Sequence, residues 1–320
     1  MDLLANGENA VSSAREPSVT VTVDSPVTLY SLLANHAGTE AFKARRVASP
    51  VVTFDYADVK VVNTQFKALM RELKYDFAEV ALVTYLQGYE YGKPYILLPA
   101  TTNGRNQHHT IFYNADRGPM TPRELNGTRV GVRAYTQTTG AWVRGFLAED
   151  YGVDLKSITW VTFEDPHLAE YHEPAHVERA AAGKQLKQML LDGEIDAAIL
   201  GDVAEQGPLT HLIPDHAAGG QRWARTHGGV PINHMAVIRQ SIAQSRPDVV
   251  REVYRVLRES RAAATLPAGL DDPLRFGVAA TRSSLEQMVA YACQQALITR
   301  RPTVDELFAD AVRILGADAD

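Results

Sequence analysis

Two histidines stand beside strand-like segments and could move protons during a reaction. His108 precedes the apolar run TIFYN, and His234 lies within PINHMAVIR. Histidine changes its charge near neutral pH, so it is a frequent general acid or base. We expect both segments to cross between two lobes of the chain, where strands line the floor of a cleft. The alternative is that each histidine only bonds to backbone at a hinge.

Glu79 and Thr84 lie in the segment DFAEVALVTYL, in a turn toward the same cleft. A carboxylate between Ala78 and Val80 is costly to bury unless it has a purpose. Glu79 could act as a general base, orient a histidine, or only place a charge at a helix start. His36 ends the first strand–loop unit and is a further candidate for ligand contact.

The segment RAYTQTTGAWVRG contains groups that could hold an anion. Thr138 is the predicted cap of a helix over 139–150, and the free N–H groups at a helix start bind carboxylates without a metal. Tyr135 and Arg144 flank this helix start, and a guanidinium pairs with a carboxylate through two hydrogen bonds. The simpler interpretation is an ordinary N-cap with a surface arginine.

Other motifs argue against several enzyme classes. His172 to His176 spell HEPAH, which matches HExxH in letters, but that zinc site needs both histidines on one continuous helix face. Pro174 interrupts such a helix, so we expect a polar loop and no catalytic zinc there. No GxGxxG, GxxxxGK[ST] or GxSxG motif occurs, and the lone Cys293 lies in an apolar helical segment.

The elements that must position these residues alternate between strands and helices, which indicates an α/β fold with helices on both faces of the sheets. Residues 115–222 form a self-contained strand–helix series, and the last block has one strand and three helices, too few strands for its own sheet. We therefore expect a flexible N-terminus (1–17), a first lobe (18–114 plus 223–320) and a second lobe (115–222). The main predicted strands are 18–23, 50–55, 129–132, 158–163, 195–202 and 231–239, and the main predicted helices are 62–73, 139–150, 183–193, 247–264, 282–297 and 303–315.

Composition narrows the function further. The 320 residues are 45% hydrophobic and 22% charged, as in a globular chain, with a net charge of −6. This charge gives no reason to bind nucleic acid or an anionic membrane surface. The single cysteine excludes an internal disulfide, and the start of the chain lacks the pattern of a secretory peptide. A cytoplasmic location is the expectation.

Several segments together resemble the 4,5-dihydroxyphthalate decarboxylase family, whose members share the two-lobed type II periplasmic-binding-protein-like fold with mixed sheets and a ligand cleft between the lobes. The matching segments run in family order from about residue 35 to 308. The chain departs from the family at Asn35-His36-Ala37, where an Asp-Tyr-Asp signature is usual, and at Gln107, where an arginine is usual; Arg105 lies two positions earlier. The segments are NHAGTEAFKARRV, DFAEVALVTYL, NQHHTIFYN, LNGTRVGVRAYTQTTGAWVRGFLAEDYGV, ITW, PINHMAVIR and ITRRPTVDELF.

The resemblance implies a decarboxylase that turns 4,5-dihydroxyphthalate into 3,4-dihydroxybenzoate and CO2 without a cofactor, although a divalent metal at the ring hydroxyls stays open. It implies proton transfer by His108 and His234, contact with a phenol by Glu79 or His36, and substrate binding by Thr84, Arg105, Tyr135, Thr138 and Arg144. The partner would be a small aromatic dicarboxylate, and a homo-oligomer stays open. The alternatives are a solute-binding-like protein that holds an aromatic acid unchanged and another lyase or cyclising enzyme on the same fold.

Overall fold

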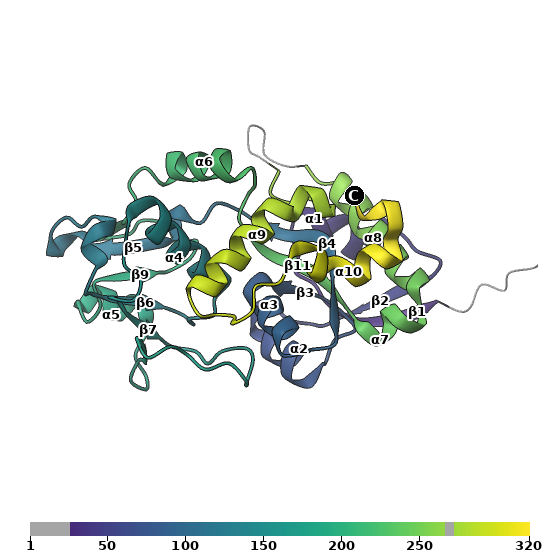
Figure 1. Cartoon of the computed structure of the whole chain (residues 1–320), viewed down its shortest axis with the longest axis horizontal. Helices are drawn as coiled ribbons and strands as arrows, with labels where there is room; N and C mark the ends of the chain where they lie inside the picture. The colour runs from purple at the N-terminus through teal and green to yellow at the C-terminus, as the bar shows by residue number, and fades with distance from the viewer. Residues whose placement is uncertain (1–25, 266–271) are drawn as a thin grey trace, which may run out of the picture.

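The computed structural model describes residues 26–265 and 272–320, so the strand predicted at 18–23 and the N-terminus 1–17 lie outside the described residues. The described chain forms two α/β lobes, each built on one mixed sheet (Figure 1). The two-lobed fold class predicted from the sequence is thereby confirmed. None of the described helices combines the length and the apolar character that a membrane span requires.

The first sheet has five strands, and β3 is the central one. Buried β3 pairs in parallel with β1 and antiparallel with β11, which returns from the C-terminal part of the chain. Its strand order is β2 (Val52–Tyr56), β1 (Val27–Leu32), β3 (Phe77–Ala81), β11 (Ile232–Arg239) and β4 (Tyr95–Gly104). Because β11 runs opposite to β3, the start of β11 lies beside the end of β3, at the same edge of the sheet.

The second sheet has six strands and mixes parallel with antiparallel pairs. Strand β5 belongs to this sheet, where it pairs antiparallel with β9 and β10. The boundary expected at residue 114 therefore lies one strand too late, because the chain enters the second sheet at Ile111. The strand order is β10 (Leu209–His211), β5 (Ile111–Asn114), β9 (Ala197–Ile199), β6 (Arg129–Val132), β7 (Thr159–Thr162) and β8 (Val177–Arg179).

Helices cover both sheets, and α9 lies beside α4 where the lobes meet (Figure 1). The three helices predicted at the C-terminus are present, and the predicted helix 62–73 begins as a 3₁₀ turn (Val62–Gln65). The α-helices are α1 (Ala37–Lys43), α2 (Phe66–Glu72), α3 (Leu82–Glu90), α4 (Thr138–Tyr151), α5 (Leu186–Asp192), α6 (His216–His227), α7 (Gln240–Ser245), α8 (Pro247–Ala262), α9 (Val278–Gln294) and α10 (Val304–Leu315).

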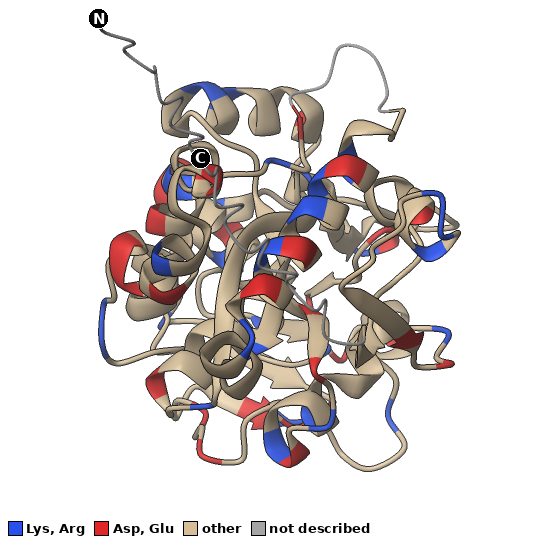
Figure 2. Ribbon diagram, turned by 90° about the vertical axis from the view of Figure 1, so that its right-hand side faces the viewer, with Lys and Arg blue, Asp and Glu red and all other residues tan. Residues whose placement is uncertain are grey.

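Helix α6 was not expected, because its segment HAAGGQRWARTH contains two glycines and resembles a loop. These glycines permit close packing instead. A Cβ at Gly220 would overlap the side chain of Asn106, and one at Gly219 would lie 3.1 Å from the ring of His108. Figure 2 shows acidic and basic residues interspersed along the described ribbon.

Candidate active site

A cavity of about 200 Å³ lies between the lobes, at the edge of the first sheet where β3 ends and β11 begins. A cavity of about 150 Å³ already accepts benzene, so one aromatic ring fits here. None of the described residues that line it is an aspartate or a glutamate, whereas two are arginines and two are histidines. The lining residues are Asn63, Phe66, Ala81, Asn103, Arg105, Arg133, Thr136, Gln137, Thr138, Thr139, His167, Asn233 and His234.

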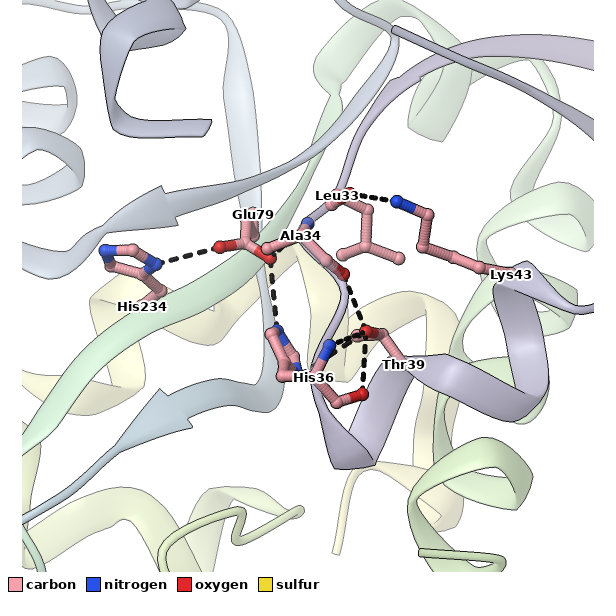
Figure 3. Close-up of polar contacts among 7 residues, drawn as sticks. All are labelled: Leu33, Ala34, His36, Thr39, Lys43, Glu79 and His234. Carbon is pink, nitrogen blue, oxygen red and sulfur yellow. Dashed lines mark hydrogen bonds and ion pairs between the residues drawn. The ribbon is translucent and has the colours of Figure 1, made fainter. Parts of the chain in front are cut away.

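Glu79 lies immediately behind this lining and joins two histidines (Figure 3). Its side chain is 1% exposed, with Oε1 2.9 Å from Nδ1 of His234 and Oε2 3.3 Å from Nε2 of His36. The backbone N–H of Ala34 donates to Oε2 at 2.9 Å. Sheet register explains the contact: Glu79 pairs with Ala236 and Ala81 pairs with His234, so Glu79 and His234 are diagonal neighbours on one face.

Glu79 is an ionised carboxylate at neutral pH. Burial alone would raise the pKa of this carboxyl, but hydrogen bonds from His234 and His36 lower it to about 2. A buried carboxylate beside an imidazole accepts a hydrogen bond from a ring N–H and fixes the orientation of the ring. Of the alternatives left open for Glu79, the geometry supports the orientation of a histidine.

The two histidines on Glu79 differ in the groups they leave free. His36 has both ring nitrogens engaged, since Nδ1 lies 3.4 Å from Oγ1 of Thr39 and Nε2 faces Glu79. Among residues 26–265 and 272–320, His234 has a hydrogen-bond partner only at Nδ1, and its other nitrogen points away from Glu79 in Figure 3. Because His234 lines the cavity, its Nε2 is the group that can reach a ligand, whereas His36 positions Glu79.

His108 does not join this site, which corrects the expectation that both crossing histidines face one cleft. Its fully buried ring stacks on Phe146 of α4 at 4.0 Å, and its Nδ1 bonds to Asn106. His108 lies in a 3₁₀ turn (His108–Thr110) ahead of β5, and this turn directs the ring into the packing of the second lobe between α4 and α6.

Arg144 and Tyr135 are also buried away from the cavity, contrary to expectation. Arg144 lies six residues after Thr138, about one and two-thirds helical turns, so the two side chains face different sides of α4. Its guanidinium lies 4.1 Å from the Tyr135 ring centre and donates to Oε1 of Gln295 at 2.7 Å. The Tyr135 hydroxyl donates to the carbonyl of Gln295 at 3.1 Å. Both residues therefore bond to Gln295, the first residue after α9.

Thr138 lines the cavity but does not cap its own helix. The N-cap of α4 is Gln137, and the Thr138 hydroxyl oxygen accepts the N–H of Val83 at 3.1 Å. Val83 is the second residue of α3, a helix whose own N-cap, Ala81, offers no side-chain acceptor. The N-termini of α3 and α4, from different lobes, therefore meet at the cavity. The positive ends of two helix dipoles favour an anion here.

Two arginines complete the anion-binding character of the cavity. Arg105, an expected ligand contact, pairs with Asp202, and Arg133, which was not singled out, pairs with Glu164 at 3.2 Å. Gln107 stands behind the lining, where its side-chain amide donates to Asn233. Where the family resemblance implies an arginine, this chain therefore has a buried amide, and Arg105 supplies a guanidinium to the cavity.

His167 also lines the cavity, although it is not among the site residues predicted from the sequence. It lies on the connection between β7 and β8, lines the cavity and is 6% exposed. Thr84, an expected ligand contact, holds it: the Oγ1 of Thr84 lies 2.7 Å from its Nδ1. The buried Leu168 and Tyr171 on the same polar loop indicate that the loop is packed, and this signal could have found it.

The segment HEPAH (172–176) is a loop, so its histidines do not share a helix face. His176 lies 3.4 Å from the Tyr135 hydroxyl, outside the cavity. Among residues 26–265 and 272–320, no three His, Cys, Asp or Glu side chains are arranged to hold a metal ion.

Comparison with solved structures shows the fold family. An alkanesulfonate-binding protein from Xanthomonas axonopodis pv. citri superposes with a TM-score of 0.52 at 12% identity, covering 88% of this chain and 98% of its own. A cysteine-to-serine mutant of DSZB, a desulfurization enzyme, in complex with biphenyl-2-sulfinic acid superposes with a TM-score of 0.51 at 13% identity, covering 89% of this chain and 99% of its own. This protein therefore has the two-lobed fold of the periplasmic solute-binding proteins, a fold that carries both receptors and enzymes.

Sequence comparison gives the particular relatives. A 4,5-dihydroxyphthalate decarboxylase from Comamonas testosteroni is 28% identical over 281 residues, which is 76% of this chain and 84% of that protein. One from Pseudomonas putida is 35% identical over 142 residues, 42% of this chain and 55% of that protein. No family model matches the chain. The resemblance to 4,5-dihydroxyphthalate decarboxylases is confirmed, and it supports an enzyme of the carboxy-lyase class.

Proposed function

We propose that this protein catalyses the non-oxidative decarboxylation of 4,5-dihydroxyphthalate to 3,4-dihydroxybenzoate and CO2. The observation that carries the proposal is His234, whose Nδ1 bonds to buried Glu79 at a cavity lined by two arginines. Within the described residues, its Nε2 has no partner and no Asp or Glu lines the cavity. The names of the relatives supply the substrate.

The reaction needs a proton donor, a source of electrons and an anchor, by which we mean the groups that bind the carboxylate that stays on the ring. Each carboxylate of this substrate has a ring hydroxyl para to it, and that oxygen supplies electrons when the ring carbon bearing the leaving carboxylate is protonated. His234 gives this proton from Nε2, and ionised Glu79 stabilises the imidazolium before transfer. The C–CO2 bond then breaks, its electron pair restores the aromatic ring, and His234 is reprotonated from water.

The anchor is the cationic part of the cavity. Arg105, Arg133 and the N–H groups in the first turn of α4 bind the carboxylate that stays on the ring. These groups fix the ring so that the carbon to be protonated faces His234. Such positioning accounts for a large share of many enzymatic rate enhancements.

The test is incubation of the purified protein with 4,5-dihydroxyphthalate, with chromatography of the acids and detection of CO2. The expected result is stoichiometric formation of the monoacid and CO2. If calorimetry shows tight binding while the diacid is recovered unchanged after hours, the protein is a solute-binding relative and the proposal is wrong.

A further inference from the structure

The connection between β7 and β8, residues 163–176, extends from the second lobe to the helices of the first lobe, and we call it the strap. Arg71 of α2 donates to the carbonyls of Pro166 at 2.7 Å and His167 at 2.8 Å. Lys93, just after α3, pairs with Glu170 at 2.6 Å. In Figure 1 this connection runs toward α2. These contacts hold His167 at the cavity from the side of the second lobe.

The ring of His167 is fixed on two sides and open on a third. Its Nδ1 faces Oγ1 of Thr84 at 2.7 Å, and it lies edge-on to Phe66 with ring centres 5.6 Å apart. His234 contacts the same phenyl ring in the same manner, at 5.3 Å. Nε2 of His167 has no hydrogen-bond partner among the described residues, although the ring lines the cavity.

The surroundings of His167 keep its imidazole neutral. Burial lowers the pKa of this ring to about 3, and the positive charges of Arg133, Lys67 and Arg71 act in the same direction. Among the described residues no carboxylate is paired with His167, whereas His234 is hydrogen-bonded to Glu79. A neutral ring with one nitrogen already engaged offers a single hydrogen bond to a ligand. It is suited to a hydroxyl, which can donate or accept as the tautomer of the ring requires.

We propose that His167 is a specificity-determining residue that recognises a ring hydroxyl of the substrate through Nε2, and that Thr84 positions it. The inference rests on the proposed function, since it assumes a hydroxylated aromatic acid in this cavity. A site built to bond a substrate hydroxyl rejects an analogue without it, because the polar group of the protein then stays unpaired.

The test compares the binding of 4,5-dihydroxyphthalate with that of phthalate, the same diacid without hydroxyls, by calorimetry. The parent protein is His234→Asn, in which slow turnover permits an equilibrium measurement. We expect it to bind the hydroxylated acid at least about tenfold more tightly, the contribution of one hydrogen bond. Adding His167→Leu should reduce this preference about tenfold and leave the affinity for phthalate within about twofold.

Thr84 provides matched variants that keep the histidine. Thr84→Val should weaken the preference in the same direction, and Thr84→Ser, which retains the hydroxyl, should restore it. This pair carries the test if His167→Leu does not fold. An unchanged preference, or equal weakening of both acids, would overturn the inference, as would a parent that binds neither acid.

Failure of the proposed function is distinguishable from failure of this inference. If the unmodified protein forms no product but its preference for the hydroxylated acid depends on His167, the decarboxylase proposal falls and the role of His167 stands. If product forms and the preference does not depend on His167 or Thr84, the decarboxylase proposal stands and the role of His167 falls.

Discussion

Replacement of Glu79 by glutamine is the sharpest test of the site, because it changes one charge and almost no volume. Glutamine keeps an oxygen that can accept the N–H of Ala34. Ala34 N–H and His36 both approach Oε2, so the glutamine oxygen stays there and the NH2 group, which can only donate, faces Nδ1 of His234. One imidazole N–H therefore loses its acceptor, and the imidazolium form of His234 loses its counter-charge.

The structure sets the size of the effect on stability. A carboxyl whose pKa falls from 4.5 to about 2 on folding stabilises the folded state by about 3 kcal/mol at neutral pH. This contribution is fully present above pH 4.5 and is lost as the pH falls toward 2, because the unfolded chain takes up the proton first. Glu79 is almost fully buried, so solvent screening does not reduce the figure.

The assay is urea unfolding of wild type and Glu79→Gln between pH 7 and pH 3, together with turnover at pH 7. We expect a gap of about 3 kcal/mol above pH 5 that narrows on acidification, and a fall in kcat of about 10²–10⁴-fold. Glu178→Gln, which breaks an exposed ion pair with Arg129, should cost less than about 1 kcal/mol. Wild-type turnover in Glu79→Gln, or a gap independent of pH, would show that Glu79 does not orient His234.

Three further substitutions separate the roles of the other residues. His234→Asn should lower turnover about 10²–10⁴-fold and change substrate affinity much less, as measured by product chromatography and calorimetry; an equal loss of both would contradict proton transfer. Arg105→Gln should raise KM about tenfold or more through loss of a carboxylate contact, and an unchanged KM would remove it from the anchor. His108→Asn should destabilise the fold by roughly 1–3 kcal/mol through loss of the stack on Phe146 while leaving KM unchanged, and a raised KM in a folded variant would return His108 to the site.

The sequence could identify Glu79 and His234 because each interrupts an apolar strand. A polar residue within a buried strand needs a partner, so local pattern alone marks both. Their contact with each other depends on the antiparallel register of β3 and β11, two strands separated by more than 150 residues. Local sequence does not determine that register, so the orienting role of Glu79 could be named only as one of several.

His108 and Arg144 show where local reasoning fails. Proximity to a crossing strand does not determine which way a side chain points, and the 3₁₀ turn before β5 aims His108 at Phe146. Arg144 lies six positions after Thr138 and faces another side of α4, so it does not reach the cavity at the helix start. It packs against Gln295 instead. His167 lies in a loop without periodicity, where the neighbouring Leu168 and Tyr171 indicate packing but do not show which polar side chain faces the cavity.

The groups around the cavity depend on contact between the lobes. The Thr138 hydroxyl of the second lobe accepts from α3 of the first, Thr84 of the first lobe holds His167 of the second, and Arg71 holds the strap. Separation of the lobes would therefore remove the α4 N-terminus and His167 from His234 in one movement, while Glu79 and His234 would stay together on the first sheet. In the proposed mechanism the first lobe supplies His234 and Arg105, and the second lobe supplies Arg133, the N-terminus of α4 and His167. If His234 protonates a fixed ring as proposed, both the reaction and the recognition of the hydroxyl require the two lobes in contact.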